Sequence, residues 1–373
     1  MNTLLHTVKK ILARDAMFSI ALLLAAGTFI FARPGFGWIN WTVLLSLFNL
    51  SAVLLALEKY NVFDRITVTL LSRSRNRRAV SLILIAVSFA GAMAVTNDVA
   101  LLVLVPLTIT IARRENFDPA FIIILETLAA NIGSSLTPTG NPQNLFLFTH
   151  YHLQVIQLVR PEVPFVLAGL CWLFILNNRV EKVKVRCGRE ETIPINAPKT
   201  GFYLVLFGLT VLSVLRILDY RIVFALVLSA VVLLDRDILA RIDYPLLGTF
   251  ACIFMFVGGL TGLPLLAGHI RAFLNTSAAA YFSSIALSQL ISNVPSAILL
   301  AGFTRRWEPV LLGVNVGGMG TLLASLASLI SYRFYVREYG NRRYLYAFLG
   351  WNLLSLVLFS GLVYAFILRP GIF

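Results

Sequence analysis

Two stretches of the chain share the seven-position pattern Asn-[Ile/Val]-Gly-[Ser/Gly]-x-x-Thr. The first runs from Asn131 to Thr137 and the second from Asn315 to Thr321. Amide, hydroxyl and backbone carbonyl oxygens are the hard ligands that small cations prefer. A polar, glycine-rich pattern that occurs once in each half of an apolar chain is typical of the paired broken segments in secondary transporters.

Each copy of the pattern follows another polar element inside a long apolar run. Thr96-Asn97-Asp98 precedes the first copy, and Ser292-Asn293-Val294 precedes the second. A helix that begins at such a break points its free N–H groups and positive dipole end at the break, which favours an anion. The alternative is that these residues merely cap a kinked helix.

Asp98 is one of the few acidic residues deep in an apolar run. A charge at that depth costs at least about 2.5 kcal/mol on insertion scales. We therefore expect Asp98 to bind a coupling ion or carry a proton, with a neutral acid or a helix cap as the alternative. Glu126 lies about one turn into its apolar segment. It is either a second such group or an interfacial carboxylate.

The break that follows Asn131 contains Pro138, Gly140 and Pro142. No continuous helix accommodates these residues without freeing backbone carbonyls. The carbonyls predict a cation environment together with the side chains of Asn131, Ser134, Thr137, Thr139 and Asn141. The corresponding residues of the second half are Asn315, Gly317, Gly318, Gly320 and Thr321. Close helix packing through small residues is the alternative, and it explains the glycines but not the asparagines.

The composition requires a membrane protein. Of 373 residues, 58% are hydrophobic and 13% are charged, whereas a soluble domain carries about 25% charged residues. Apolar and polar residues do not alternate within these runs, which disfavours a transmembrane β-barrel. We therefore expect an all-α polytopic membrane protein.

The net charge of +14 arises in short loops between apolar segments, as the positive-inside rule predicts. Nucleic acid is therefore not an expected partner. The three cysteines have no metal-ligand spacing, and no nucleotide-binding, zinc or nucleophile motif is present. We expect no enzyme activity and no cofactor beyond a sodium ion.

Segment 79–112 is too long for one ordinary helix and too short for two spans, because one span needs about 20 residues. Arginines flank both ends, including Arg77 and Arg113. If both ends are cytoplasmic, the segment is a re-entrant hairpin that turns at Thr96-Asn97-Asp98. Segment 118–149 is then a discontinuous transmembrane helix.

Counting sides from a cytoplasmic N-terminus with Lys9 and Lys10 makes segment 278–304 a hairpin entered from outside. Segment 308–332 is the second discontinuous helix. The halves 1–177 and 201–373 are then inverted repeats joined by a cytoplasmic linker, 178–200. This topology places Arg305 and Arg306 outside, against the charge rule.

Four stretches resemble the ion transporter superfamily, which includes arsenite pump membrane subunits, citrate–metal transporters and sodium-coupled dicarboxylate or sulfate carriers. They are TNDVALLVLVPLTI (Thr96–Ile109), ANIGSSLTPTGNPQNL (Ala130–Leu145), SNVPSAILL (Ser292–Leu300) and GVNVGGMGTLLASLASLISY (Gly313–Tyr332). The likeness spans nearly the whole chain. It implies two inverted repeats, each with a re-entrant hairpin and a discontinuous helix, and an elevator-type movement.

Members of this superfamily hold sodium between a hairpin tip and a broken helix, and bind an oxyanion between the two tips. The first ion region carried over to this chain is Thr96, Asn97, Thr137, Gly140 and Asn141. The second is Ser292, Asn293, Asn315, Gly317 and Thr321. Asp98 joins the expected coupling-ion residues. The expected substrate residues are Asn97, Pro138, Thr139, Ser292 and Asn293.

The tips depart from the Ser-Asn-Thr of the dicarboxylate carriers, because the third position is Asp98 in one and Val294 in the other. This departure favours an arsenite-type or proton-coupled protein. We expect a multi-pass secondary active transporter in a bacterial inner membrane. Its cargo would be a small anion or oxyacid (arsenite-like, citrate- or dicarboxylate-like, or inorganic), coupled to a sodium or proton gradient.

A sodium/proton antiporter of the same fold is the main alternative, and a passive channel or a membrane-embedded enzyme are others. The expected partners are membrane lipid, the anion and the coupling ion. The family often forms dimers, so the resemblance also implies a homodimer.

Overall fold

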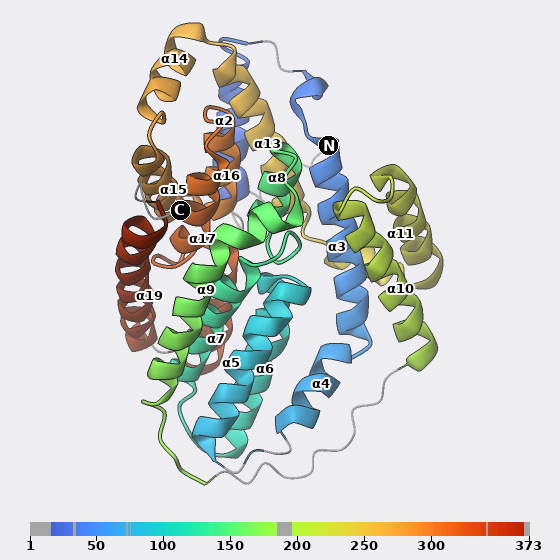
Figure 1. Ribbon diagram of the computed structural model, residues 1–373. Coiled ribbons are helices and arrows are strands. Elements are labelled where there is room, and N and C mark those ends of the chain that lie inside the picture. The colour runs from blue at the N-terminus through green and yellow to red at the C-terminus, as the bar shows by residue number, and fades with distance from the viewer. Residues whose placement is uncertain are drawn as a thin grey trace.

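The computed structural model describes residues 16–32, 35–71, 74, 76–184, 196–340 and 342–368 (Figure 1). The expected cytoplasmic N-terminus with Lys9 and Lys10, and residues 185–195 of the expected linker 178–200, lie outside the described residues. Within the described part, regular structure is helical, apart from one isolated antiparallel bridge between Asn76 and Lys184.

The first half of the chain contains eight described α-helices and one short 3-10 turn. They are α2 (Ala16–Thr28), η1 (Phe36–Trp38), α3 (Trp41–Lys59), α4 (Val62–Leu71), α5 (Arg77–Ala94), α6 (Asn97–Arg114), α7 (Ala120–Ser134), α8 (Pro142–His150) and α9 (Val155–Asn177).

The second half contains ten described α-helices and ends in a π-helical turn. They are α10 (Ala197–Val214), α11 (Tyr220–Leu234), α12 (Asp237–Arg241), α13 (Tyr244–Thr261), α14 (Pro264–Phe273), α15 (Ser277–Ile291), α16 (Asn293–Ala301), α17 (Trp307–Gly317), α18 (Leu326–Tyr339), α19 (Arg342–Val363) and η2 (Tyr364–Leu368).

Among the described residues, six helices are long and apolar enough to cross a bilayer: α3, α5, α9, α10, α13 and Arg343–Phe366 in α19. A membrane-spanning helix satisfies all its backbone hydrogen bonds internally, which is why such a chain is helical throughout. The prediction of an all-α polytopic membrane protein is confirmed.

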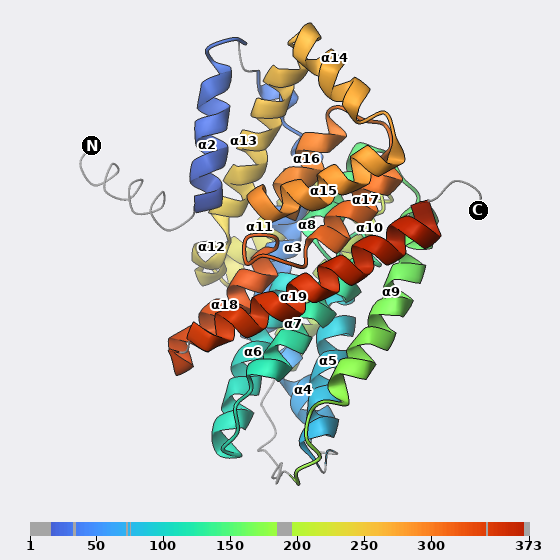
Figure 2. The same cartoon turned by 90° about the vertical axis from the view of Figure 1, so that its left-hand side faces the viewer.

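Segment 79–112 forms the helix pair α5–α6, which turns at Val95 and Thr96. The Thr96 side chain accepts a 3.3 Å hydrogen bond from the N–H of Val99 and so caps α6. Segment 278–304 forms the pair α15–α16, which turns at Ser292. Figures 1 and 2 place α5–α6 in the lower half of the molecule and α15–α16 in the upper half. The inverted relation of the two halves stays a prediction.

The Ser292 turn is strained. Its φ of 75° and ψ of 156° lie in a region that essentially only glycine adopts. The tip of the first hairpin has no such strain, because Thr96 is extended with φ of −166°. The two tips therefore differ in backbone conformation as well as in side-chain chemistry.

Each broken helix packs closely on the first helix of the neighbouring hairpin. A Cβ added to Gly133 of α7 would lie 2.3 Å from the carbonyl oxygen of Phe89 in α5. A Cβ added to Gly317 of α17 would lie 2.9 Å from Cβ of Ser288 in α15. These glycines thus allow the helix backbones to approach each other. Close packing through small residues, the alternative given above for the glycines, therefore occurs at both positions.

Candidate functional site

The two broken helices meet through the matched asparagines of the repeated pattern, and Asn131 of α7 reaches into the second break. Its Nδ2 donates to the carbonyl of Gly318 at 3.4 Å, and its Oδ1 accepts from Oγ of Ser325 at 3.1 Å. Both bonded residues lie between α17 and α18. Asn131 therefore joins the first half to the break of the second.

Asn315 of α17 makes the reciprocal contacts in the first break. Its Oδ1 accepts from Nδ2 of Asn141 and from Nε2 of Gln143, both at 3.3 Å. Its Nδ2 donates to Oδ1 of Asn144 at 2.9 Å. All four side chains are buried. The two asparagines thus brace the breaks against each other across the two halves.

The hairpin tips join the breaks through equivalent backbone bonds. The N–H of Asn97 donates to the carbonyl of Gly140 at 3.0 Å, and the N–H of Asn293 donates to the carbonyl of Ala324 at 3.0 Å. Nδ2 of Asn97 also donates to Oδ1 of Asn131 at 3.2 Å. Both tips and both breaks therefore belong to one connected polar centre. We call it the asparagine centre, and its asparagines are Asn97, Asn131, Asn141, Asn144 and Asn315.

The carbonyls that the first break frees are already hydrogen-bonded. Nδ2 of Asn144 donates to the carbonyls of Ser134, Ser135 and Thr137 at 3.3, 2.9 and 3.1 Å. A buried carbonyl without a partner is costly, so a side-chain amide takes the place of the missing helical N–H groups. In this conformation the Asn144 amide is hydrogen-bonded to carbonyl oxygens that were predicted from the sequence as cation ligands.

Gln289 of α15 has the same role in the second break. Its Nε2 donates to the carbonyls of Gly317 and Met319 at 2.8 and 3.1 Å, and its Oε1 accepts from the N–H of Thr321 at 2.9 Å. Neither Gln289 nor Asn144 was among the expected site residues. The sequence signal was present, because each is an amide side chain close to a break in an apolar run.

The hydroxyls of the expected Thr137 and Thr321 donate to backbone carbonyls and not to the asparagines of the two breaks. The hydroxyl of Thr137 donates to the carbonyl of Met93 at 2.7 Å, and that of Thr321 donates to the carbonyl of Gln289 at 3.1 Å. Thr96 caps its helix, as described above. Pro138 and Thr139 are buried between α7 and α8. Ser292 donates to the Ala324 carbonyl at 3.4 Å, beside Asn293.

Asp98 lies in the first turn of α6 and does not cap it. Its Oδ1 is buried and has no hydrogen-bond partner among the described residues. The amide of the neighbouring Asn97 instead turns back, and its Oδ1 accepts from the N–H of Asp98 at 3.0 Å. Asp98 is thus a carboxyl group with a vacant oxygen at the tip of the hairpin.

Sequence reasoning missed Glu162 of α9, which is fully buried beside the asparagine centre. Its Oε1 accepts a 2.7 Å hydrogen bond from Nδ2 of Asn315, and its Oε2 has no partner among the described residues. Helix α9 begins at Val155, so Glu162 lies inside the helix. An acid between Pro161 and Pro164 inside that helix was the available signal.

Glu126 is also fully buried, so it is not an interfacial carboxylate. Its Oε1 accepts from Oγ1 of Thr108 at 2.7 Å, and its Oε2 has no partner among the described residues. It joins α7 to α6 and has no hydrogen bond to Asn131 or Asn315 within the described part of the chain. We therefore assign Glu162, rather than Glu126, to the site.

Comparison with known proteins identifies the family. The sequence profile of the citrate transporter family, CitMHS, matches residues 7–306. The chain belongs to this family. The resemblance to the ion transporter superfamily is therefore confirmed, and the protein is a multi-pass CitMHS transporter.

Two relatives match this CitMHS chain over most of their length. The "Uncharacterized transporter MJ0456" of Methanocaldococcus jannaschii is 34% identical over 320 residues, 84% of this chain and 87% of the relative. The "Inner membrane protein YbiR" of Escherichia coli is 31% identical over 332 residues, 86% of this chain and 87% of the relative. The "Putative transporter arsB" of Dictyostelium discoideum is 27% identical over 135 residues, 36% of this chain and 24% of the relative.

In this CitMHS chain the third residues of the two hairpin tips differ in chemistry and surroundings. Asp98 brings a carboxyl group with a vacant oxygen, whereas Val294 is buried within a hydrophobic cluster built on α8, α13, α16 and α17. The polar functions of the two tips are therefore unequal, although their backbone bonds to the breaks are equivalent.

Proposed function

We propose that this CitMHS protein is a secondary active transporter that moves a small anion or oxyacid across a bacterial inner membrane. The observation that carries the proposal is the reciprocal bracing of the two breaks by Asn131 and Asn315, with both hairpin tips attached. Irregular backbone at membrane depth occurs where it is buried in protein or lines a cavity. A centre built from two such breaks is the usual form of a transporter site.

The helix directions support an anionic or oxygen-rich substrate. Helices α6, α8 and α16 begin at Asn97, Pro142 and Asn293, so three N-terminal ends lie at the breaks. Each end carries the partial positive charge of its helix dipole, which favours an oxyanion. Citrate, which the family name contains, is therefore the first substrate to test, followed by sulfate and arsenite.

For the coupling ion, the contacts favour a proton over sodium. Asn144 and Gln289 occupy the carbonyls that a sodium ion would need. Glu162 and Asp98 instead each have a carboxyl oxygen without a partner. A carboxylate in that state is costly at membrane depth, so we propose that these groups are protonated here and ionise at another stage of transport.

The test uses the full-length protein in liposomes, with citrate, sulfate or arsenite and an imposed gradient of either protons or sodium. We expect one substrate to accumulate above its equilibrium level under the proton gradient, and a protonophore to abolish the accumulation. pH-dependent sodium flux without any anion would replace the proposal by the sodium/proton antiporter. Flux that never concentrates its substrate would indicate a passive channel.

A further inference from the structure

A cavity of about 800 Å³ lies between the C-terminal ends of α8 and α14 and the loop that follows α16. Three arginines line it: Arg271, Arg305 and Arg306. The lining contains no acidic residue. The Tyr151 hydroxyl, also in the lining, donates to the carbonyl of Thr304 at 2.8 Å and holds the loop against α8.

The three arginines are exposed, and none forms an ion pair with a described residue. Nη1 of Arg306 donates only to the hydroxyl of Ser277, at 3.4 Å. The nearby carboxyl group of Glu308 interacts with the charge of Arg160, which is not part of the lining. The positive charge of the cavity is therefore not neutralised locally.

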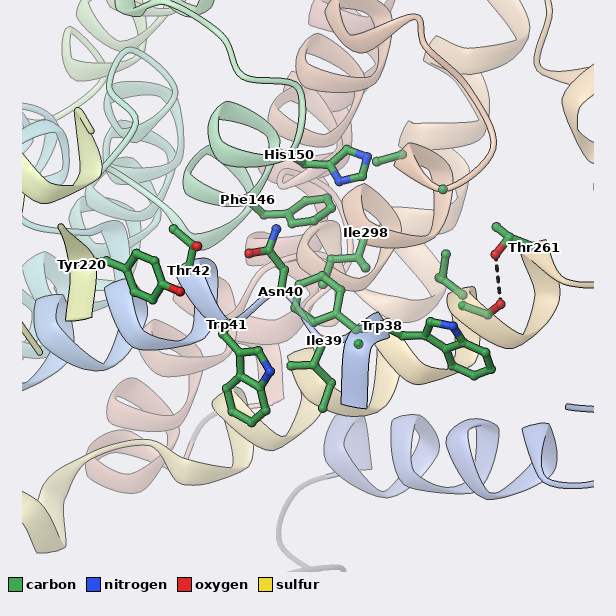
Figure 3. A pocket seen from close by; sticks show the side chains of 16 residues that line it. Trp38, Ile39, Asn40, Trp41, Thr42, Phe146, His150, Tyr220, Thr261 and Ile298 are labelled. Carbon is green, nitrogen blue, oxygen red and sulfur yellow. Dashed lines mark hydrogen bonds between the residues drawn. The ribbon is translucent and has the colours of Figure 1, made fainter. Parts of the chain in front are cut away.

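A second cavity of about 640 Å³ adjoins the first, because His150, Ala301 and Gly302 line both. Figure 3 shows its aromatic and polar lining, with Phe146 and His150 side by side on α8. Their rings stack with centroids 5.1 Å apart.

Helix α8 connects these cavities to the asparagine centre. It begins at Pro142, where Gln143 bonds to Asn315, and ends at His150 on the border of both cavities. Nine residues of helix span only about 13 Å. The charged cavity is therefore a short distance from the proposed transport site. It lies beside α14, at the opposite end of the molecule from the start of α5 and the end of α6 (Figure 1).

The topology predicted from loop charges places this end outside, where arginine is disfavoured. A concave surface with charge of one sign raises the local concentration of the opposite ion. We propose that the cavity lined by Arg271, Arg305 and Arg306 is an anion-capture site, which binds small carboxylates or oxyanions before they reach the centre. The capture role rests on the proposed transport function, whereas the affinity for anions does not.

The site favours anions over neutral oxyacids, because the charge of arginine attracts an anion and strengthens its hydrogen bonds with the guanidinium groups. It thus narrows the substrate class to anions. The phosphate of an anionic lipid has the same chemistry as a free oxyanion, so the experiment must separate the two sources.

The experiment places a cysteine at Asn275, an exposed lining residue, in full-length protein whose own cysteines are replaced by serine. Its labelling rates with a negatively charged and a positively charged methanethiosulfonate reagent are compared at low ionic strength. We express the result as the rate with the negative reagent divided by the rate with the positive reagent. This ratio should fall about tenfold in the variant R271Q/R305Q/R306Q. The matched control R221Q/R236Q/R333Q removes three exposed arginines outside the lining and should leave the ratio unchanged.

A neutral thiol reagent then reports binding. Citrate or sulfate should slow its reaction in phosphatidylcholine liposomes, and this protection should disappear in R271Q/R305Q/R306Q but not in the control. Equal ratios in both triple variants overturn the proposal. So does protection by phosphatidylglycerol alone, which assigns the arginines to lipid. Since labelling needs no transport, intact charge selectivity without transport would remove only the proposed function.

Discussion

Nδ2 of Asn315 donates a 2.7 Å hydrogen bond to Oε1 of Glu162, and both side chains are buried. The same nitrogen donates to Asn144, and the amide oxygen accepts from Asn141 and Gln143. All four hydrogen-bonding positions of the Asn315 amide are thus used. A change in the charge of Glu162 acts directly on the residue that joins α17 to the first break.

Glu162→Gln should separate binding from coupling. Glutamine retains an oxygen that accepts from Asn315 but cannot release a proton, so substrate exchange should continue while proton-driven accumulation falls at least about tenfold. Liposome uptake with and without a pH gradient measures both. Glu308→Gln, at the start of α17, is the control. Full proton-driven accumulation in E162Q would exclude Glu162 as the coupling group.

Asn315→Leu should destabilise the protein by at least about 2 kcal/mol, because it leaves several buried donors and acceptors without partners. Asn49 provides a matched control. It is equally buried in α3, yet neither of its amide atoms has a partner among the described residues. Asn49→Leu should therefore be neutral or stabilising in thermal unfolding of detergent-solubilised protein. Equal losses in both variants would contradict the bracing role of Asn315.

Ser292→Gly should raise the melting temperature, since glycine relieves a backbone conformation that costs about 1–3 kcal/mol for other residues. The hydroxyl loses only contacts of 3.4 Å. At the other tip, Thr96→Ala should lower the melting temperature, because it removes a helix cap worth about 1 kcal/mol. A decrease in both variants would show that the Ser292 turn is not strained.

The pH dependence of stability should involve Asp235, which lies after the end of α11. Burial alone raises the pKa of Asp235. Hydrogen bonds from Lys59, Tyr60 and Tyr203 outweigh the burial and hold the pKa at about 2. The Lys59 and Tyr203 contacts measure 2.7 and 2.9 Å.

Because the folded-state pKa lies below the unfolded value of about 3.9, this stabilisation is complete above about pH 4 and is lost as the pH falls towards 2. Asp235→Asn should lower the melting temperature at neutral pH and flatten its dependence between those limits. Asp237→Asn changes a more exposed partner of Lys59 and should have a smaller effect. If the melting temperature of D235N falls between those limits as it does in the unmodified protein, the loss of stability in acid comes from other carboxyl groups.

The sequence located the turns at Thr96 and Ser292, because polar residues interrupt apolar runs whose length and flanking charges do not fit simple spans. It also identified Asn131 and Asn315 as a pair. Their partners could not be predicted, since local patterns do not say that each asparagine bonds in the opposite half. The same limit applies to Asn144, whose orientation towards three carbonyls depends on the path of the break. Glu162 was missed because no local pattern shows that α9 brings it to Asn315.

The cross-bracing also constrains how the protein can be assembled. Asn131 donates to the carbonyl of Gly318, which lies 187 residues further along the chain. Asn141 donates to Asn315, which lies 174 residues further along. The ribosome must therefore complete about two thirds of the second half, residues 201–315 of 201–373, before the first break acquires its bonds to Asn315. Until then, the amides of α7 and α8 need water or the insertion machinery as temporary partners, and a chain stopped at the junction of the halves would have no finished centre.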